Sequence, residues 1–233
     1  MQIKNISLLS LAAMAVKGAA VNKDAKGPMG VEGFDLMTVE WEVQAHPGGE
    51  NLTLTGTVEE VLKELRTINP NYDQDFGITT LSSTEAIDAA IESAVTQADD
   101  VFKDAPVNCA GYDDADRKRL AQGARYLLDV QGKPTRGPGP GSCGRVSCSW
   151  NAAIYWCNMV SRFFLPVPYS MKNKTDGMGT TQDSKAKTIN SFKEISDGAY
   201  HVINKCYRGV GILVSGRAFH KDNWTVVGRW DRC

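Results

Sequence analysis

All six cysteines of this 233-residue chain lie beyond residue 108, and three of them fall within residues 137–158. The six are Cys109, Cys143, Cys148, Cys157, Cys206 and Cys233. An even set predicts three disulfides, and the spacing leaves all fifteen pairings open. A zinc site is the competing interpretation, but no Cys-x2-Cys pair occurs and the three histidines are scattered, so no metal site is predicted.

Residues 137–158 hold the sharpest local signals in the chain. Glycine and proline alternate over residues 137–141, which excludes a helix or a strand and predicts a rigid loop. Residues 145–156 follow with apolar and aromatic side chains and no breaker. This composition predicts a strand, or a bent pair of strands, at the middle of a sheet.

The first twenty residues have the pattern of a secretory signal peptide. A short basic region with Lys4 precedes a mostly apolar run over residues 6–16, and small residues Gly18 and Ala20 stand where a peptidase would cut after Ala20. The apolar run is too short to span a bilayer. We therefore expect a secreted, extracellular protein, in which disulfides persist.

Charge divides the remaining chain into two unlike parts. Residues 21–105 contain 5 Lys and Arg against 17 Asp and Glu, whereas residues 106–233 contain 19 against 10. We expect an acidic, cysteine-free segment (21–105), a candidate pro-segment, followed by a basic cysteine-rich domain (106–233). The acidic segment either lies against the basic part or forms an independent solvated surface.

The acidic segment has hairpin and helix signals. Residues 37–45 alternate apolar and polar, a turn follows at 47–49, and residues 51–55 form a second strand. Thr57 and Glu60 have capping-box spacing, which predicts a helix to about residue 68. A second helix, capped by Ser82 or Ser83, is predicted to run to about residue 102.

The cysteine-rich part predicts helices and strands around the central stretch. A helix should start at residues 113–116 and end near 130, and a capping box at Ser191 and Glu194 should start a helix that ends at Cys206. Strands are expected at residues 211–219 and 224–230. Residues 161–187 are expected to form an exposed loop. The fold class is α+β: a small disulfide-stapled α/β sandwich with an antiparallel sheet, preceded by the small cysteine-free α+β segment.

No catalytic set emerges from the sequence. His220 and Asp222 have the spacing of an oriented general base, but both lie in a predicted turn with no identifiable nucleophile beside them. Phosphate-binding glycine loops and Gly-x-Ser-x-Gly are absent from the sequence. We expect a non-enzymatic protein without a cofactor or a nucleic-acid partner.

Basic and aromatic residues interleave near the C-terminus and form a candidate binding surface for an anionic membrane or polysaccharide. They are Arg217, Phe219, Lys221, Trp224, Arg229 and Trp230. Ordinary strand faces are the competing explanation of the same pattern. Glycosylation sequons occur at Asn51, Asn173 and Asn223, and Asn173 is the best placed because it lies in the long loop.

Three stretches, 137–158, 191–206 and 214–227, resemble a family of secreted cysteine-rich proteins of filamentous fungi. The resemblance rests on Gly-Pro-Gly-Ser-Cys-Gly-Arg-Val-Ser-Cys at 139–148, an aromatic-Cys-Asn strand end, a helix ending in cysteine and a final Asn-Trp-x-Val. The order of elements is also similar to the smut-fungus killer toxin. The resemblance implies a non-enzymatic effector or toxin-like protein that acts on a host or competitor cell. A binding module for cell-wall glycan or host protein and a secreted hydrolase remain as alternatives.

Overall fold

The computed structural model describes residues 30–78, 85, 88–89, 92–93, 101–136, 141–159 and 186–233. The predicted signal peptide, the cap at Ser82 or Ser83 and residues 161–185 of the predicted loop lie outside these residues. The helices are α1 (Val58–Ile68), α2 (Tyr72–Asp75), α4 (Arg117–Leu128) and α5 (Phe192–Cys206). The strands are β1 (Asp35–Leu36), β2 (Glu40–Gln44), β3 (Asn51–Thr55), β4 (Val107–Asn108), β5 (Ala115–Asp116), β6 (Gly132–Arg136), β7 (Ser142–Ser149), β8 (Ala152–Asn158), β9 (Lys187–Thr188), β10 (Leu213–Val214), β11 (Gly216–His220) and β12 (Trp224–Trp230).

The largest sheet has six strands in the order β1-β7-β8-β12-β11-β4. Its centre is the antiparallel run β7-β8-β12-β11, and only β1 joins β7 in parallel. The apolar stretch after the Gly-Pro loop is thus the β7-β8 hairpin, which confirms the predicted pair of strands. Its turn is formed by Trp150 and Asn151, both at positive φ (52° and 60°), which the tight primed turns of hairpins require.

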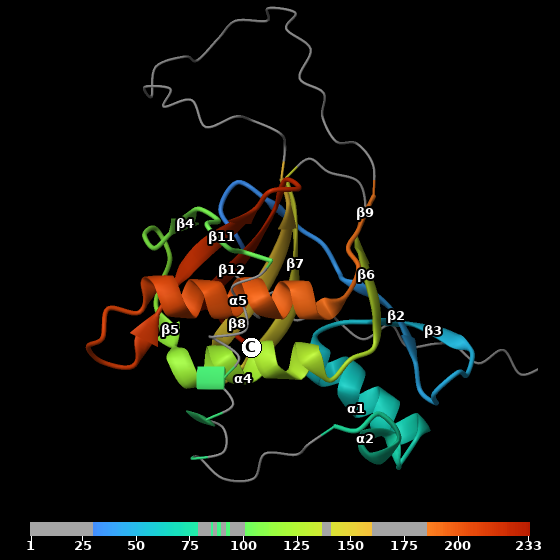
Figure 1. Cartoon of the computed structure of the whole chain (residues 1–233). Helices are drawn as coiled ribbons and strands as arrows, with labels where there is room; N and C mark the ends of the chain where they lie inside the picture. The colour runs from blue at the N-terminus through green and yellow to red at the C-terminus, as the bar shows by residue number, and fades with distance from the viewer. Residues whose placement is uncertain are drawn as a thin grey trace, which may run out of the picture.

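Helices α4 and α5 lie side by side across one face of this sheet, which we call the inner face (Figure 1). Val146, Ile154, Trp156 and Val226 point to this face and join the main core with the apolar stripes of both helices. In α5 the stripe includes Ile195, Ala199, Val202, Ile203 and Cys206, as the sequence predicts. This helix-on-sheet arrangement is the predicted α+β class.

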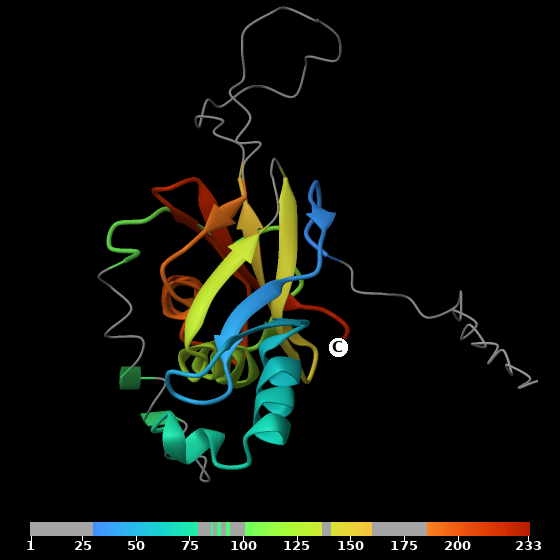
Figure 2. The ribbon, with the colours of Figure 1, turned by 90° about the vertical axis from the view of Figure 1, so that its right-hand side faces the viewer.

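The acidic segment shares strands and core with the cysteine-rich part. The β2-β3 hairpin forms as predicted, and β2 also pairs with β6, which gives a second sheet in the order β3-β2-β6-β9. Trp41 of β2 stacks on Phe192 of α5 with ring centroids 4.2 Å apart. Figure 2 looks onto the β2-β3 hairpin beside β6, with α1 below the hairpin. One continuous core therefore runs from Val39 to Val226.

The three helices α1, α4 and α5 start where the sequence predicts, and cap hydrogen bonds are present in two of them. Glu60 accepts a hydrogen bond from the Thr57 amide (2.8 Å), so the first capping box is confirmed. Asp116 caps α4 by accepting from the Arg119 amide at 3.0 Å. Ser191 is the N-cap of α5 as predicted, but the capping box is wrong, because the Ser191 side chain makes no cap hydrogen bond and the Glu194 amide donates to the Ser191 carbonyl (3.3 Å).

The predicted strand 211–219 is two strands that pair with different partners. β10 pairs with β5 in a separate two-stranded sheet, whereas β11 pairs with β12 and β4. The break falls at Ser215, whose hydroxyl bonds to the Tyr112 carbonyl (3.1 Å) and to the Asp114 carboxylate (2.5 Å). These contacts join Ser215 to residues about a hundred positions earlier in the chain, at the point where the strand changes partner.

Three disulfides are present, as predicted: Cys109–Cys206, Cys143–Cys157 and Cys148–Cys233. The first ties the loop after β4 to the end of α5, the second joins facing residues of the β7-β8 hairpin, and the third anchors the C-terminal residue. Such bonds form in an oxidising compartment. Within the part of the chain that the structure describes, no helix combines the length and the hydropathy that crossing a bilayer requires.

Candidate functional site

Strand register gathers three arginines on the outer face of the large sheet, opposite α4 and α5. Arg217 of β11 stands beside Val227 of β12, which pairs with Tyr155 of β8, which in turn pairs with Arg145 of β7. Arg229 lies two residues further along β12 and therefore points to the same side. Beneath them is a small second core of Val31, Cys143, Ala153, Tyr155, Cys157 and Val227.

Arg217 is half-buried among aromatic rings. Its guanidinium carbon lies 4.8 Å from the centroid of Phe34, 5.7 Å from Tyr112 and 5.9 Å from Phe219. Its Nε is buried and has no hydrogen-bond partner, and no described carboxylate forms an ion pair with it. Burial lowers the pKa of Arg217 from its ordinary value. Among the described residues, Arg217 thus stands in a partly desolvated site without an ion-pair partner.

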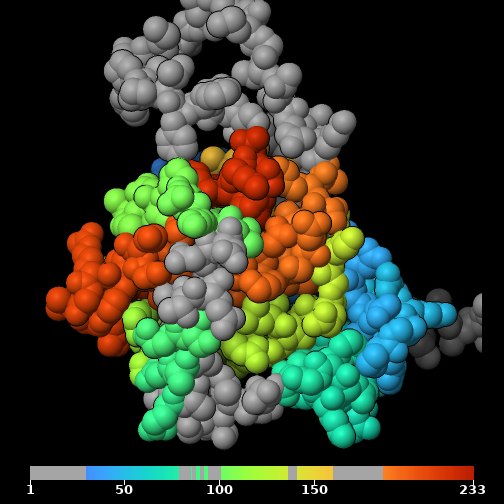
Figure 3. All heavy atoms as spheres, in the orientation of Figure 1, coloured from blue at the N-terminus to red at the C-terminus, as the bar shows by residue number. Residues whose placement is uncertain are grey.

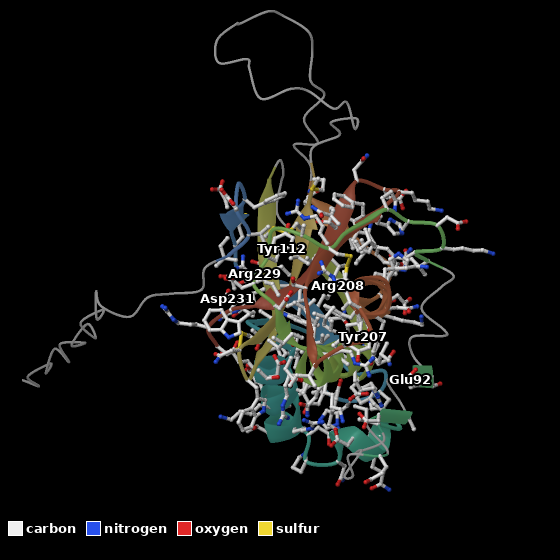
Figure 4. The ribbon with its side chains drawn as sticks, turned by 90° about the vertical axis from the view of Figure 1, so that its left-hand side faces the viewer. Glu92, Tyr112, Tyr207, Arg208, Arg229 and Asp231 are labelled. Atoms are coloured by element: carbon white, nitrogen blue, oxygen red, sulfur yellow. A yellow bond between two sulfur atoms is a disulfide. The ribbon has the colours of Figure 1, made fainter. Side chains whose placement is uncertain are left out.

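The two other arginines on this face have polar partners. Arg229 donates to the Gly30 carbonyl (3.1 Å), lies 3.4 Å from Asp113 and stands over the Tyr112 ring at 5.7 Å. Arg145 donates to the Arg232 carbonyl at 2.7 Å. We call Phe34, Tyr112, Arg217, Phe219 and Arg229 the arginine face. Figure 4 shows Tyr112 and Arg229 on the side of the molecule turned toward the viewer.

A buried acid lies beside the arginine face. The Tyr155 hydroxyl donates to the carboxylate of Asp231, which also accepts from the Arg232 amide at 2.7 Å. Burial and, next, Asp231 raise the pKa of Tyr155 above its usual range. Through these bonds Asp231 connects the residues after β12 to Tyr155 of β8.

The structure brings together only part of the predicted binding surface. Arg217, Phe219 and Arg229 lie on the arginine face, and Lys221 is exposed in the turn before β12. Trp224 is 1% exposed and packs on the inner face against Phe102 and His220. Trp230 is half-buried against the main core.

The sequence did not point to two members of the arginine face, Phe34 and Tyr112. Phe34 immediately precedes β1, whose parallel pairing with β7 has no short-range signal. Tyr112 lies three residues after Cys109, in the loop that the first disulfide holds against α5. Proximity to a cysteine was the only signal in the sequence that could have drawn attention to Tyr112.

His220 and Asp222 form a local turn contact. The His220 Nδ1 accepts from the Asp222 amide at 3.2 Å, and the Asp222 carboxylate lies 3.5 Å from the same nitrogen. The imidazole stacks on Trp224 with centroids 4.3 Å apart. Burial lowers the pKa of His220, and Asp222 partly opposes this shift. The ring is thus packed on Trp224, and its Nδ1 is engaged by the backbone of its own turn.

Histidine, cysteine and acidic residues do not assemble into a metal-binding group of three or more anywhere in the described ranges. Of the three sequons, Asn51 is exposed on β3, where it donates to Glu42 at 2.6 Å. Asn223 is exposed in the turn before β12, at φ 60°. Asn173 lies outside the described residues.

The arginine face offers one unbalanced cation, a second arginine and three aromatic rings, a combination that binds anionic groups next to planar or apolar surfaces. Comparison with known proteins adds no precedent for such a site in this fold. No family model, curated protein or solved structure matches this chain.

Proposed function

We propose that this protein is a secreted, non-enzymatic effector or killer-toxin-like protein, which acts on a host or competitor cell by binding an anionic ligand at the arginine face. The resemblance to secreted cysteine-rich fungal proteins supports the first part of the proposal. The three disulfides support export, since they require an oxidising compartment.

The observation that carries the proposal is Arg217. A partly desolvated guanidinium destabilises the fold when no anion accompanies it. Binding of an anion from outside the chain would offset this cost, which supports a ligand site at Arg217. Phe34 and Tyr112 flank the charge and would contact the apolar surface of the same ligand. Acidic polysaccharide fits this chemistry, because it carries carboxylates next to the apolar faces of sugar rings.

A pure binding module for cell-wall glycan is the second candidate. The same arginine face favours it, and the two candidates differ in whether the bound cell is altered. A hydrolase has less support: the His220 imidazole, which lies near the Asp222 carboxylate, is packed on Trp224 and accepts from the chain's own backbone.

Binding of polygalacturonate, compared with neutral dextran, tests the proposal. Arg217→Met removes the charge but keeps an unbranched stem, and Arg217→Lys keeps the charge. Loss of one hydrogen-bonded charge contact should weaken binding of the acidic polymer by about tenfold or more. Arg66→Met is the matched control, since Arg66 is an exposed arginine of α1 paired with Asp73.

The proposal predicts that wild type and Arg66→Met bind the acidic polymer equally and prefer it to dextran. Arg217→Met should lose the preference, and Arg217→Lys should retain part of it. Equal binding by wild type and Arg217→Met overturns the role of the arginine face. Adding wild type and Arg217→Met to living plant or fungal cells then distinguishes an effector or toxin from a pure binding module, because only an effector or toxin alters the cells after binding.

A further inference from the structure

The loop between α5 and β10, residues 207–213, exposes an apolar tip. Val210 is 84% exposed, Ile212 60% and Leu213 54%, and they account for three of the seven exposed large hydrophobic residues in the described part of the chain. The loop projects from the left of the molecule in Figure 1, and its atoms stand out from the surface at the left of Figure 3. Isolated exposed aliphatic residues are common, but a cluster of three marks an interaction site.

The loop is held rigidly in this projecting position. The disulfide Cys109–Cys206 fixes its first end, and pairing of β10 with β5 fixes its last. Between them the Tyr207 hydroxyl donates to the Gly211 carbonyl (3.2 Å), and the Arg117 amide donates to the Ile212 carbonyl (2.7 Å).

Two glycines let the chain turn back at the tip. Gly209 and Gly211 have φ of 74° and 76°, in the region that side chains disfavour. With the turn anchored at both ends, the aliphatic side chains remain largely exposed. A cavity of about 430 Å³ lies between the loop and Tyr112, and Val210 and Ile212 are among its lining residues.

The base of the tip is positively charged. Lys205 and Arg208 are exposed, and neither forms an ion pair within the described ranges. The nearby acids are engaged elsewhere: Asp114 accepts from Ser215 and Asp116 caps α4. Arg117 lies over the Tyr207 ring at 4.5 Å and pairs with Glu92 at 3.8 Å. Figure 4 shows Arg208 and Tyr207 on the same side of the molecule.

We propose that residues 207–213 insert into the interface of a lipid bilayer that carries anionic headgroups. Val210, Ile212 and Leu213 enter the boundary between headgroups and acyl chains, while Lys205 and Arg208 contact the headgroups. A narrow projecting tip suits this partner, because a stable protein interface needs about 1,000 Å² or more of complementary surface. The cations at its base favour an anionic membrane over a second copy of this chain.

Flotation of the full-length secreted protein with vesicles tests this inference. Vesicles of phosphatidylcholine with phosphatidylserine should retain the protein, vesicles of phosphatidylcholine alone should retain less, and added salt should reduce the difference. Ile212→Ser should weaken partitioning by about tenfold, the value for withdrawing one large aliphatic side chain from an apolar phase. Arg208→Gln should weaken it by about fivefold on anionic vesicles only.

The matched control is Ile68→Ser, at the end of α1, where the isoleucine is 45% exposed. Both serine variants should keep the wild-type urea midpoint, since neither side chain is buried, and Ile68→Ser should bind vesicles as wild type does. Absence of wild-type binding to anionic vesicles overturns the inference, and so does an equal loss in Ile212→Ser and Ile68→Ser. Self-association that Ile212→Ser abolishes, without vesicle binding, assigns the tip to a second copy instead.

The inference is independent of the arginine face. Arg217→Met should lose binding to the acidic polysaccharide but still bind anionic vesicles. Ile212→Ser should lose binding to the vesicles but still bind the polysaccharide. Loss of vesicle binding in Arg217→Met would show that the arginine face, and not the tip, binds the membrane, and would refute the inference.

Discussion

Gly198 sets how closely α5 approaches the large sheet, and replacing it with alanine tests that spacing. A methyl group added there would lie 2.5 Å from Cγ2 and 2.9 Å from Cβ of Val226, and 2.8 Å from Cζ of Phe102. Val226 belongs to a central strand and Phe102 is fully buried, so neither can rotate away without disturbing the core.

Two effects oppose each other in Gly198→Ala. Alanine favours a helix interior over glycine by about 1 kcal/mol. Overpacking of a well-filled core costs about 1 to 3 kcal/mol, and contacts this short to two rigid neighbours belong at the upper end. We expect a net loss of about 2 kcal/mol in the free energy of unfolding.

Urea unfolding of the oxidised protein, followed by tryptophan fluorescence, measures this loss. Gly123→Ala in α4 is the comparison variant, because the nearest atom there is the Ser147 hydroxyl (2.3 Å), which can rotate at the expense of its bond to Glu59. Its loss should be smaller than that of Gly198→Ala. A Gly198→Ala protein as stable as wild type would show that this contact does not set the distance between α5 and the sheet.

Three further predictions concern stability. Replacing Cys143 and Cys157 together by alanine opens a loop of sequence separation 14 and should lower the free energy of unfolding by about 3 kcal/mol in a urea titration; an unchanged midpoint would contradict this. Burial lowers the pKa of His220, so the unfolded chain binds its proton more readily and stability should fall as the pH drops below about 6.5, a slope that His220→Gln should reduce in urea titrations across pH. Tyr155→Phe removes one donor from the buried Asp231 carboxylate, which keeps the Arg232 amide, and should cost about 1 to 3 kcal/mol by the same assay, whereas a neutral result would mean that water replaces the hydroxyl.

Local patterns predicted local structure well. The alternation before Pro47 predicted the β2-β3 hairpin, and the spacing of Thr57 and Glu60 predicted the start of α1, because each signal acts within a few residues. Ser191 and Glu194 have the same spacing, and α5 starts there without the cap hydrogen bond. The pattern therefore predicts where a helix starts more reliably than it predicts the cap bond.

The sequence did not predict which strands distant in the chain pair with each other. The parallel contact of β1 with β7 and the insertion of β6 beside β2 join residues about a hundred positions apart, and no local pattern encodes them. The same limit applies to the arginine face. Strand alternation places Arg217, Phe219 and Arg229 on one side of the β11-β12 hairpin. Only the structure shows that Phe34 and Tyr112 contact Arg217 and that Trp224 is buried in the core.

The charge division of the chain bears directly on Arg217. Residues 21–105 carry a net charge of −12. The part of them that reaches the arginine face contributes the ring of Phe34, the carbonyl of Gly30 and one carboxylate, Glu32, which is close enough to act on Tyr112 but forms no described ion pair with Arg217. The two parts are joined mainly by strand pairing and by apolar contacts such as Trp41 on Phe192, and ion pairs between them, such as Asp88 with Lys118, lie at α4. Among the described residues, the acidic segment thus packs against the basic part through strand pairing and apolar contacts and forms no ion pair with Arg217, and the proposed anion site rests on this arrangement.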